Sequence, residues 1–338
     1  MSKLFQLILA LAATGLAAGS AAATTLDDVK AQGAVRCGVN EGLVGFAARD
    51  DSGTWGGFDV DFCKAVAAAV LGDPNAVEFM PLSTTDRFDA LKNGKVDLLV
   101  RNTTWTMSRE TELDLAFGFV NYYDGQGFMV RRDDGFTSAL DMSGATVCVA
   151  TGTTTEANLV NYFELNKMQL EVMTLDGADE ALAAYDSGDC DAYTTDSSAL
   201  YSYRLSLKTP DDHFILPEII SKEPLGPVVR QGDEEWSNIV KWVGFALLNA
   251  EELGVKQENV DNMKASDNQD IRILLDVDGG LGESLGLGSD WVVNVLKAVG
   301  NYGEIFNRNI GTDSDLQIAR GLNALWTRGG IQYAPPVR

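Results

Sequence analysis

Three places in the chain carry polar side chains that can hold the charged ends of a small molecule. Arg109 follows the stretch NTTWTMS, Thr153 and Thr154 lie just before a predicted helix, and Asp196 ends a predicted strand. A guanidinium fork suits a carboxylate, free N–H groups at a helix start bind anions, and strand ends are where ligands of α/β sheets bind. These residues are therefore the first candidates for a binding site.

Each candidate also has an ordinary structural alternative. An arginine at the surface pairs readily with a neighbour such as Glu110. Thr154 or Thr155 can serve only as the cap of the helix that follows. Asp196 can serve as a turn former. The residues alone leave these alternatives open.

Several other chemistries are disfavoured by composition. The chain has one histidine, His213, and no CxxC motif, so zinc sites and a Cys–His nucleophile lack partners. A calcium loop at 276–282 lacks the alternating acidic ligands and the closing glutamate. The formal net charge of -23 excludes nucleic acid as a partner, because phosphate binding needs clustered Lys and Arg. We expect no metal and no cofactor.

The four cysteines predict two disulfides in an exported chain, and three pairings are open in principle. Cys37 lies in an early predicted strand and Cys63 in the helix that follows it. Cys148 and Cys190 lie in two predicted strands of the second half. Local pairing, Cys37 with Cys63 and Cys148 with Cys190, is therefore our prediction.

Strands and helices alternate twice along the chain and predict two α/β units. The first half predicts a strand at 34–39, a helix opening at Asp59, a strand at 77–80, a Thr84-capped helix at 84–93 and a strand at 96–100. The second half repeats this order over 146–150, 155–166, 170–174, 178–187 and 190–194. Such alternation implies parallel sheets with right-handed crossovers, and two such lobes create a cleft.

The ends of the chain have different characters. Residues 1–23 predict an export signal, with Lys3, an apolar run and the small residues Ala21 to Ala23, and no further segment predicts a membrane span. Residues 24–127 and 226–338 are expected to form lobe 1 with a helical C-terminal extension, and 128–225 to form lobe 2. Interlobe crossings are expected near 125–130 and 224–230, and 266–289 is expected to be a long surface connection.

An ordered set of motifs resembles a known family. The set is GGFDVDFCKAVAAAV at Gly56, GKVDLLVRNTTWTMSRE at Gly94, GTTTEANL at Gly152 and CDAYTTDSSALY at Cys190. Together with the leader, it resembles the polar amino acid solute-binding proteins of ABC importers, and within them the general L-amino acid and glutamate/glutamine/aspartate/asparagine binders. The resemblance implies the type II periplasmic binding fold, two Rossmann-like lobes joined by two crossings.

The resemblance also implies a role for each candidate residue. Arg109 would bind the ligand α-carboxylate, together with the backbone and hydroxyls at Thr153 and Thr154, while Asp196 would pair with the α-ammonium. Asn102 and Thr104 occupy positions that meet the same two groups.

Side-chain preference would come from Arg87, which matches the arginine that acidic-amino-acid binders place on the distal carboxylate, assisted by Thr84. The alternative for Arg87 is a solvated ion pair with Asp86 or Asp89. Arg101 is a second candidate, although strand alternation predicts that it faces away from Asn102.

Two positions depart from the family pattern. Leu43 stands where many members carry an aromatic lid, for which Phe46, Trp55 or Trp105 can substitute, and Asn40 stands where many carry an acidic residue. The resulting expectation is a periplasmic, non-enzymatic binder of acidic amino acids and their amides that delivers its ligand to the permease subunits of an ABC importer. The alternatives are a binder of broad specificity for polar amino acids or a periplasmic enzyme such as a dehydratase on the same scaffold.

Overall fold

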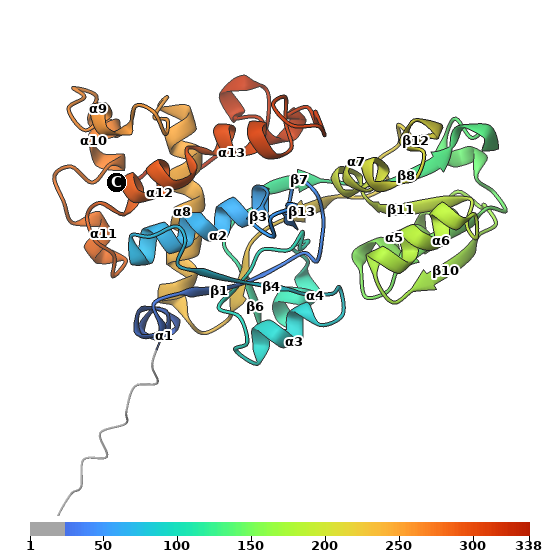
Figure 1. Ribbon diagram of the computed structural model, residues 1–338, viewed down its shortest axis with the longest axis horizontal. Coiled ribbons are helices and arrows are strands. Elements are labelled where there is room, and N and C mark those ends of the chain that lie inside the picture. Colours follow the sequence, from blue (N-terminus) through green and yellow to red (C-terminus); the bar gives the residue numbers. More distant parts are fainter. Residues whose placement is uncertain (1–23) are drawn as a thin grey trace, which may run out of the picture.

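The computed structural model describes residues 24–338, and the predicted leader at 1–23 lies outside the described residues. Two lobes lie side by side along the long axis of the molecule, and two extended strands connect them (Figure 1). Each lobe is built on its own five-stranded sheet with helices against it. The predicted two-lobed α/β fold is confirmed.

Lobe 1 contains a sheet in the order β4-β1-β5-β14-β6. β1 pairs parallel with β4 and β5, whereas β14 runs antiparallel to β5 and β6, so the sheet is mixed rather than wholly parallel as predicted. The elements of this part are α1 (Thr25–Gln32), β1 (Val35–Val39), β2 (Ala48–Arg49), β3 (Trp55–Gly56), α2 (Phe58–Leu71), β4 (Val77–Pro81), α3 (Arg87–Lys92), β5 (Leu98–Leu99), α4 (Met107–Thr111), β6 (Leu115–Phe117) and β14 (Val228–Arg230).

Lobe 2 contains the second sheet, in the order β10-β9-β11-β8-β12. β9, β10 and β11 are parallel, and β8 and β12 add antiparallel pairs. Its elements are β8 (Gln126–Arg131), β9 (Thr146–Ala150), α5 (Thr154–Leu165), β10 (Glu171–Leu175), α6 (Ala178–Ser187), β11 (Ala192–Asp196), α7 (Ser197–Ser206) and β12 (His213–Ile215), with 3-10 turns at Arg132–Asp134, Ala139–Asp141 and Pro210–Asp212.

The two crossings form an antiparallel pair between the lobes. β7 (Tyr122–Asp124) leads from lobe 1 to lobe 2, and β13 (Glu223–Leu225) leads back. β7 lies before the first predicted crossing at 125–130, whereas β13 overlaps the start of the second at 224–230. Residues 126–131 and 228–230 already belong to the two sheets. Glu223 lies directly opposite Asp124 in this pair, so two acidic side chains occupy the hinge.

The C-terminal part folds back onto lobe 1 as helices. They are α8 (Glu234–Glu252), α9 (Val260–Met263), α10 (Gln269–Leu274), α11 (Leu281–Ser284), α12 (Trp291–Val299) and α13 (Tyr302–Asn309), followed by 3-10 turns at Gly321–Asn323 and Trp326–Arg328. α12 packs along α2 (Figure 1). The long surface connection expected at 266–289 contains two short helices, α10 and α11, and most of its residues are exposed or half-buried. Asp276 is buried there and accepts hydrogen bonds from the N–H groups of Leu281 and Gly282.

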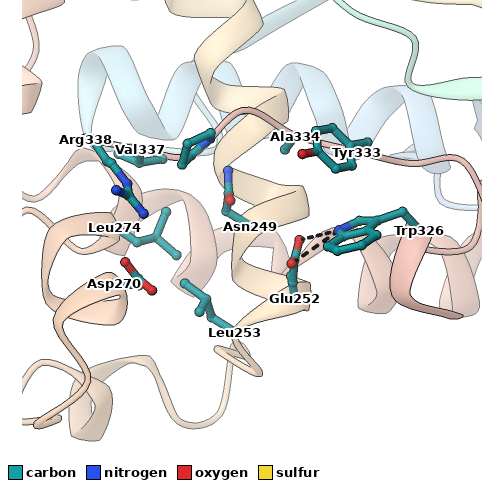
Figure 2. Close-up of a pocket in the computed structure, with 11 residues that line it drawn as sticks. Asn249, Glu252, Leu253, Asp270, Leu274, Trp326, Tyr333, Ala334, Val337 and Arg338 are labelled. Atoms are coloured by element: carbon teal, nitrogen blue, oxygen red, sulfur yellow. Dashed lines mark hydrogen bonds between the residues drawn. The ribbon is translucent and has the colours of Figure 1, made fainter.

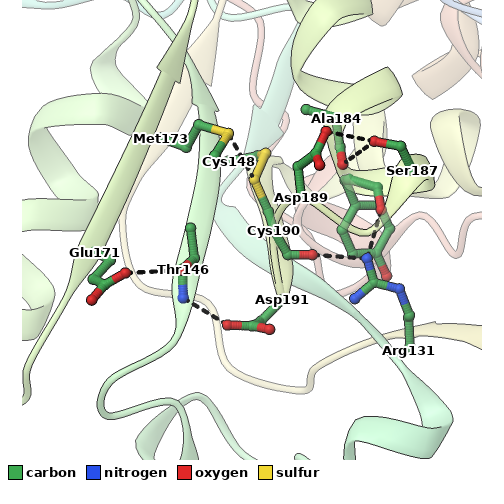
Figure 3. Close-up of a disulfide and its surroundings, with 11 residues drawn as sticks. Arg131, Thr146, Cys148, Glu171, Met173, Ala184, Ser187, Asp189, Cys190 and Asp191 are labelled. Atoms are coloured by element: carbon green, nitrogen blue, oxygen red, sulfur yellow. Dashed lines mark hydrogen bonds between the residues drawn. A yellow bond between two sulfur atoms is a disulfide. The ribbon is translucent and has the colours of Figure 1, made fainter.

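Two disulfides join Cys37 to Cys63 and Cys148 to Cys190, the local pairs expected from the sequence. The first ties β1 to α2 in lobe 1. The second ties β9 to the start of β11 in lobe 2, where Arg131 donates a hydrogen bond to the Cys190 carbonyl at 2.8 Å (Figure 3). Each lobe therefore carries one covalent link between neighbouring elements.

We expect the double variant Cys148→Ala, Cys190→Ala to lose stability in lobe 2. The disulfide spans 42 residues, and restricting an unfolded loop of that length is worth about 4 kcal/mol in the chain-entropy model. All six tryptophans lie outside residues 126–220, so their fluorescence reports lobe 1, whereas circular dichroism reports both lobes. In urea, the dichroism transition should move to lower concentration while the fluorescence transition moves less. Equal shifts of both would contradict an effect confined to lobe 2.

Candidate functional site

A cavity between the lobes is lined by all the polar residues that the sequence predicts as ligand contacts. It holds about 480 Å³ of space not filled by protein atoms. Its lining residues are Asn40, Leu43, Thr84, Arg87, Arg101, Asn102, Thr104 and Arg109 from lobe 1, and Ala150, Thr153, Thr154, Thr155, Ala178, Thr195, Asp196, Ala199 and Tyr203 from lobe 2. Residues far apart in sequence thus converge on one polar space between two halves of the molecule.

Three arginines line this cavity and are almost fully buried. Arg87, Arg101 and Arg109 are 3%, 5% and 7% exposed. Within residues 24–338, none of the three has a carboxylate oxygen within 4.0 Å. Burying a charge without a partner is costly, and burial lowers the pKa of all three guanidinium groups. The cavity is therefore suited to an anionic ligand that would supply the missing partners.

Arg109 is held in place by local structure rather than by an ion pair. Thr106 caps the short helix α4 and accepts a hydrogen bond from the Arg109 N–H. The guanidinium donates from Nη1 to the Thr104 carbonyl at 2.8 Å and lies 5.1 Å from the Phe88 ring centre. Glu110, the neighbour that an ordinary surface pair would use, accepts instead from Trp105 Nε1. The other N–H groups of the Arg109 guanidinium can therefore bind a ligand in the cavity.

Arg87 lies at the start of α3 and contacts the same aromatic ring. Its guanidinium is 4.7 Å from the Phe88 ring centre, and Nη1 donates to the Arg101 carbonyl at 3.4 Å. Buried Nε has no hydrogen-bond partner. The predicted alternative, an ion pair with Asp86 or Asp89, does not form in the described part of the chain. Phe88, which the sequence analysis missed, is thus the platform for two arginines.

Thr84 does not cap the helix as predicted. α3 begins at Arg87, its N-cap position is Asp86, and no side chain caps it. Thr84 instead lines the cavity, and its buried Oγ1 has no hydrogen-bond partner. A threonine just before a helix usually caps it, but here the hydroxyl is left free for a ligand.

The prediction that Arg101 faces away from the site was wrong. β5 ends at Leu99, and Asn102 adopts a left-handed φ of 43°, so strand alternation does not extend to these residues. Arg101 lines the cavity and donates from Nε to the Leu82 carbonyl at 3.0 Å. Both amide atoms of Asn102 are buried without partners. Unusual backbone of this kind clusters at functional sites.

The lobe 2 side of the cavity is the start of helix α5. Thr153 is the N-cap, one residue earlier than predicted, and its hydroxyl accepts from the Glu156 N–H at 3.3 Å. Thr154 is the first helical residue, and its Oγ1 donates to Glu223 at 2.8 Å. Thr153 therefore caps the helix and also borders the cavity, and Thr154 borders the cavity beside it.

Asp196 brings a carboxylate to the same space. It ends β11, precedes α7 without capping it, and is 8% exposed. Burial, followed by the nearby carboxylates of Asp124 and Glu223, raises its pKa well above the usual value. A cationic group on a ligand would stabilise the ionised form of Asp196 and so offset the cost of burying that carboxylate.

Glu223 is the functional candidate that the sequence analysis missed. It is 1% exposed on the return crossing and contacts residues of both lobes. Its opposite neighbour Asp124 is half-buried, and desolvation raises the pKa of that carboxyl to about 6, although hydrogen bonds from Ser198 and Gly125 act in the other direction. A lone glutamate beside Pro224 in an extended segment carries no periodic signal that could have identified it.

The apolar lining differs from the one expected. Leu43 does border the cavity, and Tyr203 of α7 borders it from lobe 2. None of the three suggested substitutes does so. Phe46 packs against Phe58 and Tyr122, Trp55 against Phe79, and Trp105 stacks on Phe117. Tyr203 is therefore the aromatic residue that lines the described cavity, and it lies on the opposite lobe from Leu43.

The buried carboxylate of Asp59 contacts the backbone of Asn102. Asp59, from the GGFDVDF motif, accepts a hydrogen bond from the Asn102 N–H, and its Oδ2 has no partner. Burial raises the pKa of Asp59 to about 7, despite the opposing effects of that hydrogen bond and of Arg101. The motif thus positions the left-handed residue without lining the cavity itself.

Asp59 should make stability depend on pH. Because its folded pKa, about 7, lies above its usual value of 3.8, the folded protein binds the proton more tightly. Its contribution to stability is therefore greatest at low pH and falls as pH rises from 4 to 7, by on the order of 4 kcal/mol. We expect the unfolding free energy of Asp59→Asn, measured in urea, to fall less than that of wild type over this range. An Asp51→Asn control, at an exposed site, should follow wild type. Parallel pH curves for all three proteins would contradict the assignment.

A larger hollow lies elsewhere on lobe 1. It holds about 700 Å³ between the end of α8, α10 and the C-terminal tail. Figure 2 shows Trp326 reaching Glu252 there, with Tyr333 and Arg338 on the tail above. All of these side chains are exposed. The hollow lacks the buried, unpartnered polar groups of the inter-lobe cavity, which is therefore the better candidate for a specific site.

Residues 24–338 contain no candidate metal site and no candidate membrane-spanning helix. No group of three or more His, Cys, Asp or Glu side chains is arranged to hold a metal ion. No helix in this range is long and apolar enough to cross a bilayer.

The arrangement of two lobes, two crossings and a polar cavity defines a solute-binding protein. The family described as bacterial extracellular solute-binding proteins, family 3, matches residues 35–262, and the chain belongs to this family.

Similar proteins agree over nearly the full length. The chain is 59% identical over 339 residues to the general L-amino acid-binding periplasmic protein AapJ of Rhizobium johnstonii, covering 100% of this chain and 99% of that protein. It is 53% identical to the glutamate/glutamine/aspartate/asparagine-binding protein BztA of Rhodobacter capsulatus, covering 97% of each. A periplasmic binding protein of an ABC transporter from Brucella ovis, solved with glutathione bound, is 59% identical with a TM-score of 0.92, covering 94% of this chain and 100% of that one.

Proposed function

We propose that this protein binds a free L-amino acid with an acidic side chain, or the corresponding amide, between its lobes. The observation that carries the proposal is the set of three buried arginines without carboxylate partners, next to a buried aspartate in the same cavity. A zwitterion with a second acidic group would partner both kinds of charge. The printed specificities of the relatives from Rhizobium johnstonii and Rhodobacter capsulatus support the same ligand class.

Each end of the ligand has its own set of groups. Arg109 and the free N–H groups at the start of α5 bind the α-carboxylate. Asp196 binds the α-ammonium, with Asn102 and Thr104 nearby. Arg87 and Thr84 bind the distal carboxylate, and Arg101, which lines the same cavity, shares that role. Most of these residues are already buried in the folded protein, namely Thr84, Arg87, Arg101, Thr104, Arg109 and Asp196.

Binding couples to closure because the site is divided between the lobes. A ligand first contacts one lobe, and the second rotates over it about β7 and β13. The closed form is the shape that the permease subunits of an ABC importer would recognise. The predicted leader at 1–23 would place this cycle in the periplasm, as in the relative from Rhizobium johnstonii.

A second candidate ligand is glutathione, the molecule bound to the Brucella ovis relative. Its γ-glutamyl end carries an α-ammonium and an α-carboxylate, and its glycine end carries a second carboxylate. The observation that favours it is the number of buried arginines, three, which exceeds what one α-carboxylate needs. In this case Arg109 and Asp196 would hold the γ-glutamyl end, while Arg87 and Arg101 would face the remainder of the peptide.

Isothermal titration tests the proposal. Protein unfolded and refolded to remove carried-over ligand is titrated with L-glutamate, L-glutamine, L-arginine, L-leucine and glutathione. Tight binding of glutamate or glutamine, with little of arginine or leucine, supports the proposed ligand class. Comparable binding of all four amino acids indicates broad specificity, glutathione alone indicates the second candidate, and no binding at all overturns the proposal.

A further inference from the structure

Glu223 contacts both lobes from the return crossing. Oε2 accepts hydrogen bonds from Thr104 Oγ1 of lobe 1 at 2.6 Å and from Thr154 Oγ1 of lobe 2 at 2.8 Å. Oε1 accepts from Asn158 Nδ2 at 2.8 Å and from Ser221 Oγ at 2.6 Å. Thr154 and Asn158 are four residues apart on α5 and therefore share one face. Four donors thus surround one carboxylate that does not itself line the cavity.

The two threonines have only one hydroxyl proton each. Both hydroxyls lie within donating distance of the same Glu223 oxygen, at 2.6 and 2.8 Å, but 3.5 Å from each other, so each directs its proton to Glu223 rather than to the other threonine. The Ser221 hydroxyl is free to do the same, because its oxygen already accepts from the Gln126 N–H at 3.3 Å. Thr104 and Thr154 therefore present oxygen lone pairs to the cavity, and these lone pairs accept hydrogen bonds.

We infer that Glu223 is a positioning residue that makes Thr104 and Thr154 hydrogen-bond acceptors for the α-ammonium group of the ligand. This inference rests on the proposed function. It changes the expected role of the Thr154 hydroxyl, which the family resemblance assigned to the carboxylate. The backbone N–H groups at the start of α5 keep that role, since Glu223 does not contact them.

The arrangement separates the two ends of the ligand. Arg109 offers donors to a carboxylate. Asp196 and the two threonine hydroxyls offer three acceptors around the same cavity, and an ammonium group has three N–H donors. Because Thr104 and Thr154 come from different lobes, an ammonium bound between them also links the lobes. Glu223 would thereby couple recognition of the ammonium to closure.

The test compares L-glutamate with glutarate, the same dicarboxylate without the ammonium group, by isothermal titration. Wild type must first bind L-glutamate, and if it does not, the proposed function fails and not this inference alone. In the variant Thr104→Val, Thr154→Val, the dissociation constant of L-glutamate should rise at least about tenfold. That of glutarate should stay within about twofold, as expected for lost acceptors. Equal weakening of both ligands would mean that the hydroxyls serve a carboxylate and would overturn the inference.

Substitution of Glu223 itself gives an independent readout. Glu223→Met removes both acceptors and should weaken L-glutamate about tenfold or more in otherwise wild-type protein. In the Thr104→Val, Thr154→Val background it should add less than about twofold, because residues that act together are not additive. Glu223→Gln keeps one carbonyl oxygen for the two hydroxyls and should stay within about threefold of wild type. Additive losses, or a Gln variant as weak as the Met variant, would contradict positioning through the threonines. Should Glu223→Met fail to fold by circular dichroism, the threonine variant decides alone.

Discussion

Arg109→Ala is expected to abolish measurable binding of every L-amino acid, with the dissociation constant rising about a thousandfold or more. The variant removes a two-pronged, charge-assisted contact to the α-carboxylate and leaves that buried carboxylate with only the N–H groups of α5, which costs several kcal/mol. The lost group is common to all L-amino acids, so glutamate and glutamine should be affected alike. Isothermal titration of refolded protein measures the effect.

A surface arginine provides the matched control. Arg132 is outside the cavity and donates to the Asp211 carbonyl in lobe 2. Arg132→Ala removes the same charge from the molecule and should bind as wild type does. If Arg109→Ala binds glutamate within about tenfold of wild type, Arg109 is not the carboxylate ligand and the orientation proposed for the ligand is wrong.

Arg87→Ala is expected to weaken acidic ligands far more than amides. Loss of one charge-assisted contact to a distal carboxylate predicts about a 30-fold weaker affinity for L-glutamate. L-glutamine, which lacks that charge, should change about threefold or less. The ratio of the two dissociation constants, rather than either value alone, is the quantity to compare.

Arg101→Ala separates the two candidates for the distal carboxylate. Both arginines are buried in the cavity, and each hydrogen-bonds a backbone carbonyl, Arg87 that of Arg101 and Arg101 that of Leu82. If Arg87 is the main contact, Arg101→Ala should leave the glutamate-to-glutamine ratio closer to wild type. A changed ratio in Arg101→Ala and an unchanged one in Arg87→Ala would assign the role to Arg101 instead.

Much of the fold could be predicted because its signals are local. The helix at Ala178–Ser187 and the strand at Thr146–Ala150 match their predicted bounds, since glycines or polar residues end both patterns clearly. The edges of the sheets were less predictable. β6, β8, β12 and β14 pair antiparallel with neighbours distant in sequence, so no local period indicates them.

The site was predictable where family motifs mark it and not where it depends on backbone geometry. Arg109 and Asp196 come from such motifs, and the structure places both in the cavity. Arg101 was misplaced because the strand ends early and Asn102 turns left-handed, which no hydrophobic pattern reveals. Glu223 was missed because its importance comes from donors on both lobes, and these meet only after folding.

The most direct test is a crystal structure of refolded protein with L-glutamate. The expected result is one glutamate in the cavity between the lobes. Its α-carboxylate contacts Arg109, its ammonium contacts Asp196, and its distal carboxylate contacts Arg87 or Arg101. A ligand found elsewhere, such as the hollow at the C-terminal tail of lobe 1, or an inter-lobe cavity that stays empty at saturating glutamate, would contradict it.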